Sequence, residues 1–119
     1  MAQSSTGSEE FERLAAEALD GLPDWVRRRL DNVEVMIEEE PPADVPGLLG
    51  LYEGIPLTER GSDYTWALPD RITLYRSSIE AEAGPDPEDL KGVVADTVIH
   101  EVAHFFGISD ERLDELGRD

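Results

Sequence analysis

Cysteine is absent from this 119-residue chain, and histidine occurs only twice, at positions 100 and 104. Without thiols the chain has neither disulfides nor thiolate metal sites, so a metal ion would need His, Asp or Glu ligands. No apolar run reaches the roughly 20 residues that span a bilayer. Residues 1–10 also lack the apolar core of a secretory signal. We therefore expect a cytoplasmic protein with no membrane partner.

Basic residues are also scarce. The chain has 10 Lys and Arg against 28 Asp and Glu, a formal net charge of -18. Phosphate contacts require a surface rich in Lys and Arg, so we expect no nucleic-acid partner. The simplest explanation of this charge is solubility. A more specific explanation is a preference for cationic substrates.

The length is that of one domain. We expect a flexible tail over residues 1–7 and a single domain over residues 8–119. After Ser8, a potential N-cap, apolar residues recur at helical spacing until Gly21, which predicts a first helix. A second short helix is expected from Pro23 to Leu30, since proline suits the first helical position.

The hydrophobic period then changes to two. Val33, Val35 and Ile37 alternate with more polar residues, which is typical of a half-buried strand. Two further strands are expected after it, at residues 48–52 and at residues 71–77. A long polar loop at residues 58–63 and a short piece of sheet at residues 64–67 are expected between them.

A long helix follows the strands. Asp86 is its expected N-cap and Pro87 its first residue, and the helix should run to about Phe106. Gly107 supplies the left-handed turn that ends it. A last short helix is expected over residues 110–116. The order of elements predicts the α+β fold class.

The long helix carries His100-Glu101-Val102-Ala103-His104. Imidazoles four residues apart lie on one helical face about one turn apart, and both can reach one zinc ion. Glu101, beside the first ligand, is placed to take a proton from a metal-bound water. The alternative is an ordinary helix with two surface or core histidines. Both histidines of the chain fall in this motif, which favours the metal site.

A catalytic zinc site usually has three protein ligands. Asp110 follows His104 by six residues, after the turn at Gly107, where the metzincin pattern places its third ligand. Asp110 could instead cap the last helix, alone or together with Ser109. The carboxylates further along are reserve candidates: Glu111, Asp114 and Glu115.

Weaker candidates lie elsewhere. Asp96 precedes His100 by one turn and could support a ligand, although a solvated helix face is the simpler interpretation. Thr97 could line the site or could equally be a filler residue. Three further residues could donate to an oxyanion but are more often packing or surface residues: Tyr64, Arg71 and Tyr75.

Three segments, HEVAHFFGISDERLDELG, LLGLYEGIPLTER and LPDRITLYR, resemble the small bacterial zincin-like proteins, described as possible zinc metallopeptidases. The resemblance covers nearly the whole chain. It implies a minimal zincin: a small mixed sheet packed on an N-terminal helical segment and the long HExxH helix. It also implies one Zn²⁺ per chain on His100, His104 and Asp110, with Glu101 as the catalytic base.

The resemblance implies a zinc-dependent metallopeptidase that hydrolyses peptide bonds in a peptide or protein substrate. Zincins align the substrate on an edge strand above the active-site helix, and Arg71–Ser77 is the candidate strand. Two alternatives remain open. One is a catalytically silent zinc-binding or scaffold module. The other is a zinc-dependent endoribonuclease-like hydrolase, which the net charge disfavours.

Overall fold

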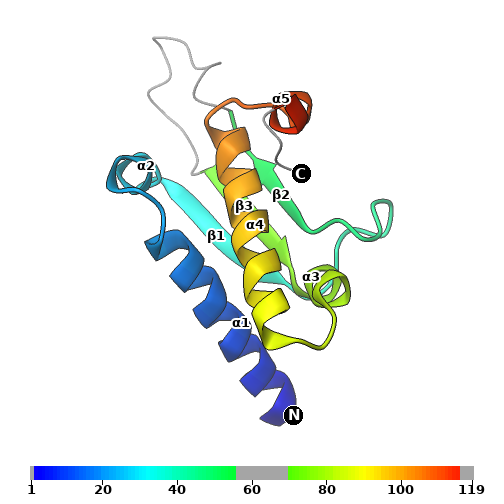
Figure 1. Cartoon of the computed structure of the whole chain (residues 1–119). Helices are drawn as coiled ribbons and strands as arrows, with labels where there is room; N and C mark the ends of the chain where they lie inside the picture. The colour runs from blue at the N-terminus through cyan, green and yellow to red at the C-terminus, as the bar shows by residue number, and fades with distance from the viewer. Residues whose placement is uncertain (1, 56–69, 116–119) are drawn as a thin grey trace.

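The computed structural model describes residues 2–55 and 70–115, and the expected loop at 58–63 and sheet piece at 64–67 lie outside them. The helices and strands follow one another in an α+β order (Figure 1). They are α1 (Ala2–Asp20), α2 (Asp24–Arg29), β1 (Val33–Glu38), β2 (Gly50–Glu53), β3 (Asp70–Tyr75), α3 (Arg76–Ala83), α4 (Pro87–Phe105) and α5 (Asp110–Glu115).

The three strands form one mixed sheet in the order β1-β3-β2. β1 runs parallel to β3, with Val33 opposite Asp70, and β2 runs antiparallel to β3, with Gly50 opposite Leu74. The expected mixed sheet is therefore confirmed. The expectation that Arg71–Ser77 forms the edge strand is wrong, because β3 is the central strand. Residue alternation predicts that a segment is a strand but not which neighbours it has.

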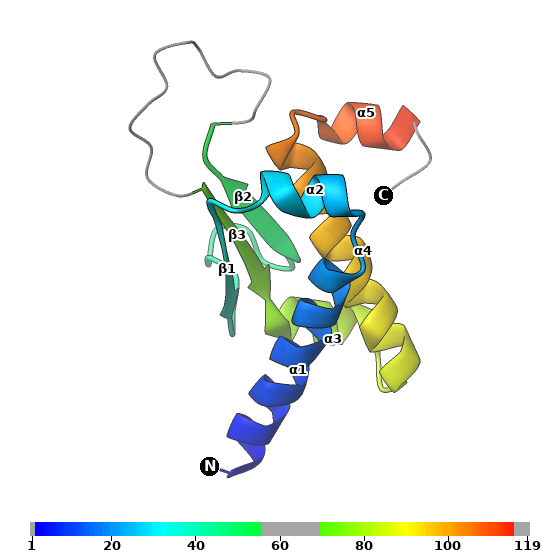
Figure 2. The same cartoon turned by 90° about the vertical axis from the view of Figure 1, so that its left-hand side faces the viewer.

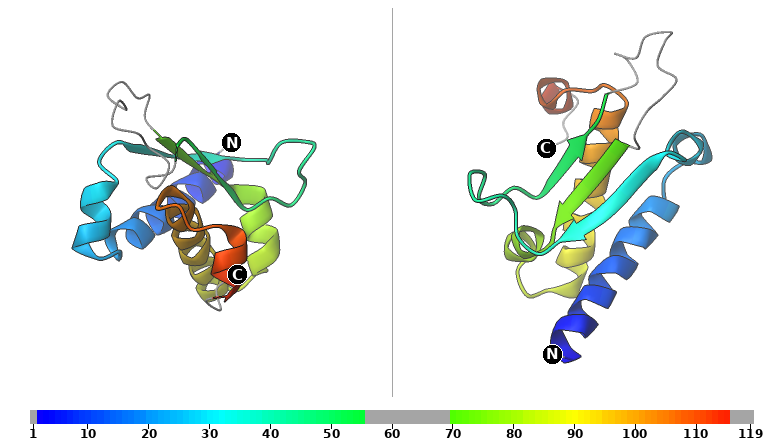
Figure 3. Two further views of the ribbon diagram at one scale, coloured as in Figure 1. Left: turned by 90° about the horizontal axis from the view of Figure 1, so that it is seen from above. Right: turned by 180° about the vertical axis from the view of Figure 1, so that it is seen from behind.

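One face of the sheet carries α1 and α4, and Figure 2 and the rear view in Figure 3 show both helices on that side. Their apolar faces meet the sheet in a common core. The core is built mainly from these buried residues: Phe11, Leu14, Ala15, Val26, Ile72, Leu74, Ile79, Val94, Val98 and Val102. No helix in the described part of the chain is both long and apolar enough to cross a bilayer.

Two boundaries differ from expectation. α1 begins at Ala2 instead of after Ser8, so the expected tail is helical. Extending a formed helix adds one hydrogen bond for each residue fixed, which offsets the weak propensities of Ser, Thr and Gly. β3 ends at Tyr75, and α3 begins at once at Arg76. Arg76 binds Glu80 at 3.0 Å, an i,i+4 pair that stabilises the first turn.

α4 begins and ends as the sequence predicts. The Asp86 carboxylate accepts the Glu88 N–H at 2.9 Å, and Pro87 is the first helical residue. At the other end Gly107 has φ of 91°, the left-handed conformation in which glycine has no Cβ to clash. Both ends of the helix that carries the motif are therefore specified by local interactions.

Candidate metal centre

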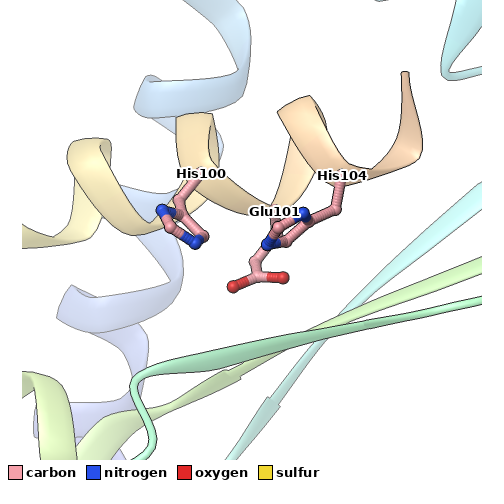
Figure 4. A group of neighbouring side chains, drawn as sticks. All are labelled: His100, Glu101 and His104. Atoms are coloured by element: carbon pink, nitrogen blue, oxygen red, sulfur yellow. The ribbon is translucent and has the colours of Figure 1, made fainter. Parts of the chain in front are cut away.

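The motif residues lie on α4 where it passes the sheet. His100 and His104 project from one face, and their ring centroids are 4.8 Å apart. Figure 4 shows both imidazoles and the Glu101 carboxylate gathered beside the strands. The potential ligand atoms of these three residues all lie within 4.8 Å of one another. The helical spacing thus brings two nitrogen donors and one carboxylate together.

The turn after α4 orients the second histidine. The Gly107 N–H donates to the His104 carbonyl and the Ile108 N–H to the Ala103 carbonyl, both at 2.9 Å, so the chain reverses sharply. The Ile108 carbonyl then lies 2.8 Å from Nδ1 of His104. Because a carbonyl only accepts, Nδ1 carries the proton and Nε2 presents a lone pair. One hydrogen bond fixes both the ring and its tautomer.

The same turn brings Asp110 to the two imidazoles. Oδ1 of Asp110 lies 2.8 Å from Nε2 of His100 and 2.9 Å from Nε2 of His104. Ser109 caps the N-terminus of α5, because its hydroxyl oxygen accepts the Arg112 N–H at 3.1 Å. Asp110 is the first residue of α5, and its carboxylate is directed at the histidines.

The donor set fits a cation. Three acceptor atoms converge: the two Nε2 atoms and Oδ1 of Asp110. Since the His104 proton is held at Nδ1, its Nε2 lone pair faces a carboxylate oxygen, an arrangement that repels unless a proton or a metal ion lies between them. Two imidazoles and one carboxylate are a common ligand set for catalytic zinc.

Burial acts to raise the pKa of Asp110. When the imidazoles are protonated, the hydrogen bond from His100 and the charges of both rings outweigh it and hold the pKa of Asp110 below its ordinary value. The carboxylate is therefore the ionised form that a metal ion requires.

Glu101 has a different environment. Its side chain is only 6% exposed and lies against β2, where the Tyr52 backbone N–H donates to the carboxylate. Burial raises the pKa of Glu101 above its ordinary value, although the charges of His104 and His100 oppose the shift. A buried carboxylate with a raised pKa beside a cation site is typical of a proton carrier in catalysis.

Among the strands of residues 2–55 and 70–115, β2 is the edge strand next to this site. The Tyr75 N–H donates to the Leu49 carbonyl at 2.9 Å, so in the antiparallel ladder Leu49 and Leu51 bond to β3. The backbone groups of Gly50 and Tyr52 therefore point away from β3, to the edge. A Cβ on Gly50 would lie 2.9 Å from Cγ2 of Thr97 and 3.1 Å from Cγ of Glu101. Only glycine lets β2 approach α4 this closely.

Sequence reasoning missed Tyr52 and Asp70. The Tyr52 hydroxyl donates to Asp70 at 2.6 Å, and Asp70 is 2% exposed. The Tyr52 ring packs edge-on against Phe105 with centroids 6.1 Å apart. Tyr52 thus joins two buried carboxylates, through its hydroxyl to Asp70 and through its N–H to Glu101. The alternation around Tyr52 predicts a strand but carries no signal of this pairing.

The weaker candidates have other roles. The Thr97 hydroxyl donates to the Val93 carbonyl at 2.8 Å, and Asp96 is exposed. Arg71 pairs with Glu34 at 3.7 Å across the β1–β3 register. Tyr75 is buried, and its pKa is raised by burial and by nearby carboxylates. Tyr64 and the side chains of Asp114 and Glu115 lie outside the described residues.

A cavity of about 410 Å³ adjoins the site. It lies between the segment leading into β2 and the middle of α4, and both His100 and Glu101 line it. At this volume it is in the lower range of small-molecule and side-chain pockets.

Residues 30–118 match the model of the zincin-like metallopeptidase family. Among solved structures, the chain is similar to a conserved hypothetical protein from Thermus thermophilus. The two share 28% sequence identity with a TM-score of 0.57, over 94% of this chain and 99% of the other. No curated protein matches the chain.

Proposed function

Because the chain belongs to the zincin-like metallopeptidase family, we propose that it is a zinc-dependent peptidase. In this proposal His100, His104 and Asp110 hold the ion and Glu101 acts as the catalytic base. The observation that carries it is the convergence of both Nε2 atoms on one carboxylate oxygen, with a second, buried carboxylate alongside.

When bound, Zn²⁺ acts as a Lewis acid on a carbonyl oxygen and lowers the pKa of a coordinated water to about 7. The chain's contribution is to orient the ligands. The Ile108 carbonyl holds His104 with Nε2 facing inward. The Gly107 turn delivers Asp110 to the same point.

Glu101 moves the proton. Its carboxylate accepts a proton from the attacking water and returns it to the leaving amine, so the amide breaks without expelling an amide anion. The pKa of Glu101 is raised by burial, which brings it closer to that of the water and the amine. The Tyr52 N–H fixes the carboxylate and occupies one of its roughly four lone-pair sites, so others remain to accept the proton.

The edge of β2 aligns the substrate. In this proposal an extended peptide adds as a further strand on the side of β2 that faces away from β3, where Gly50 is buried and Leu51 and Tyr52 are half-buried. Main-chain hydrogen bonds contribute affinity for any peptide sequence, and the side-chain pockets determine which sequences are preferred. The strand is short, Gly50–Glu53, which limits this contact to a few residues of the substrate.

The direct test replaces the base. Glu101→Gln keeps the shape and the Tyr52 contact but cannot carry a proton. We expect zinc content to stay at one ion per chain, while peptide hydrolysis falls by about 10² to 10⁴. Zinc is measured by elemental analysis of protein purified without chelator, and hydrolysis with a mixed pool of fluorogenic peptides. A variant that hydrolyses peptides at the parent rate would disprove this role for Glu101.

The third ligand is tested by Asp110→Asn, with the adjacent Glu111→Gln as the matched control. Loss of the carboxylate should weaken zinc at least about 100-fold, because the first coordination shell loses its anionic member. Competition against a chromophoric chelator gives the affinities. Equal zinc affinity in Asp110→Asn and the parent would exclude Asp110 as a ligand. A loss of zinc affinity in Glu111→Gln would instead assign Glu111 as the third ligand.

A further inference from the structure

The cavity beside His100 and Glu101 is a separate feature from the ligand cluster. It is bounded by residues 47–50 on one side, by Val93, Asp96 and Thr97 of α4 on the other, and by Glu82 of α3. In Figure 1, α3 and the segment that enters β2 lie beside α4. Since His100 and Glu101 also line the cavity, a side chain that enters it lies beside the candidate site.

The inner walls are apolar. Leu48, Leu49 and Val93 are half-buried there, and Thr97 is 5% exposed. The Thr97 hydroxyl is already bonded to the Val93 carbonyl at 2.8 Å, so it needs no hydrogen bond from an occupant. Such walls suit a methylene stem, which gains free energy by leaving water.

The acidic side chains among the described lining residues give the cavity a negative character. Glu82 and Asp96, both exposed, line the cavity together with the buried Glu101. Among the described residues that line it, none is Lys or Arg. The whole chain carries a net charge of -18, so the surrounding field has the same sign. An anionic or short polar side chain is disfavoured here, and a cation at the end of an apolar stem is favoured.

We propose that this cavity binds a lysine or arginine side chain of the substrate, next to the bond that is cleaved. The stem lies along Leu49 and Val93, and the cationic end lies at Glu82 and Asp96. This assignment rests on the proposed peptidase function for its link to cleavage. The occupancy of the cavity itself does not depend on turnover.

Binding is therefore measured where no turnover occurs. In the Glu101→Gln background, the probes are two fluorescein-labelled polyalanine heptapeptides. One has a central lysine and the other a central norleucine, which has an uncharged stem. Fluorescence anisotropy gives both affinities at low and high salt. An exposed ion pair changes affinity by up to about fivefold, so the lysine peptide should bind about two- to fivefold more tightly, and less so in high salt.

The charge is then removed. Glu82→Gln with Asp96→Asn, added to the same background, should make the two peptides bind equally. The control is Asp89→Asn, which removes a carboxylate two helical turns earlier on α4, outside the cavity, and should preserve the preference. Circular dichroism checks that each variant is folded.

Three results would overturn the proposal: equal binding of both peptides, a preference that survives Glu82→Gln with Asp96→Asn, or one that Asp89→Asn abolishes equally. Hydrolysis by the parent chain is scored separately. If neither the two peptides nor the mixed pool is cleaved, the peptidase proposal fails. The relative affinities of the lysine and norleucine peptides still show whether the cavity binds a cationic side chain.

Discussion

The two edge strands of the sheet, β1 and β2, flank the same central strand but approach the helices differently. At β2 the packing is so close that a single methyl group on Gly50 would meet Thr97 and Glu101. Beside β1 a cavity of about 190 Å³ remains, lined by Leu19 and Leu30 with Val33 and Val35. At Gly50 the strand touches α4 directly, with the 410 Å³ cavity opening beside this contact, whereas β1 is separated from Leu19 and Leu30 by the smaller cavity.

The polar residues of β1 and β2 also differ in whether they face solvent or the protein interior. β1 exposes Glu34 and Glu38, and Glu34 meets Arg71 at 3.7 Å with both side chains half exposed. Charges on an exposed edge strand discourage pairing with other chains. On β2 the polar groups of Tyr52 are instead used internally, on Asp70 and Glu101. The charges of β1 protect that edge from pairing, and the proposed function assigns substrate binding to the β2 edge.

The largest effect is expected where the packing is closest. Gly50→Ala places a methyl group 2.9 Å from Cγ2 of Thr97, so β2 must move away from α4. We expect a loss of about 1–3 kcal/mol in the free energy of unfolding from overpacking. Peptide hydrolysis should fall about 10- to 100-fold, because the strand and Glu101 no longer hold their relative positions. Urea denaturation and initial rates measure the two effects.

Gly92→Ala is the matched control for that change. Gly92 lies inside α4 with open space where its Cβ would be. Alanine there should stabilise the helix by about 0.5–1 kcal/mol. If both alanine variants shifted stability in the same direction, the close approach of β2 to α4 would not be the cause.

A smaller effect on peptide hydrolysis is expected from Tyr52→Phe. The change removes the 2.6 Å hydrogen bond to the buried Asp70 but keeps the ring and the backbone N–H that holds Glu101. We expect a loss of about 1–3 kcal/mol in stability, with a smaller loss of hydrolysis than in Gly50→Ala. The midpoint of urea denaturation gives the first value.

The other edge provides the reference for Tyr52→Phe. Glu34→Gln removes only the exposed pair with Arg71 and should change stability by less than about 1 kcal/mol. Equal losses at Glu34 and Tyr52 would remove the distinction between the two edges.

Much of the fold is local and was predictable. The N-cap at Asp86, the glycine turn at Gly107 and the strand over Val33–Glu38 all depend on neighbours within a few residues. α3 was missed because Arg76 and Ser77 continue a β-like pattern. The helix is stabilised in part by a contact between residues distant in sequence, the 2.7 Å ion pair between Arg76 and Glu39.

The sequence by itself determined the motif helix, its capped start, its left-handed end and the spacing that puts two imidazoles on one face. These follow from helical periodicity and from hydrogen bonds within a turn or two. Tertiary structure alone decided that β3 is central, that β2 is the edge beside Glu101, and that a cavity with acidic residues opens next to His100. Strand neighbours and close approaches depend on long-range pairing, which residue alternation does not encode.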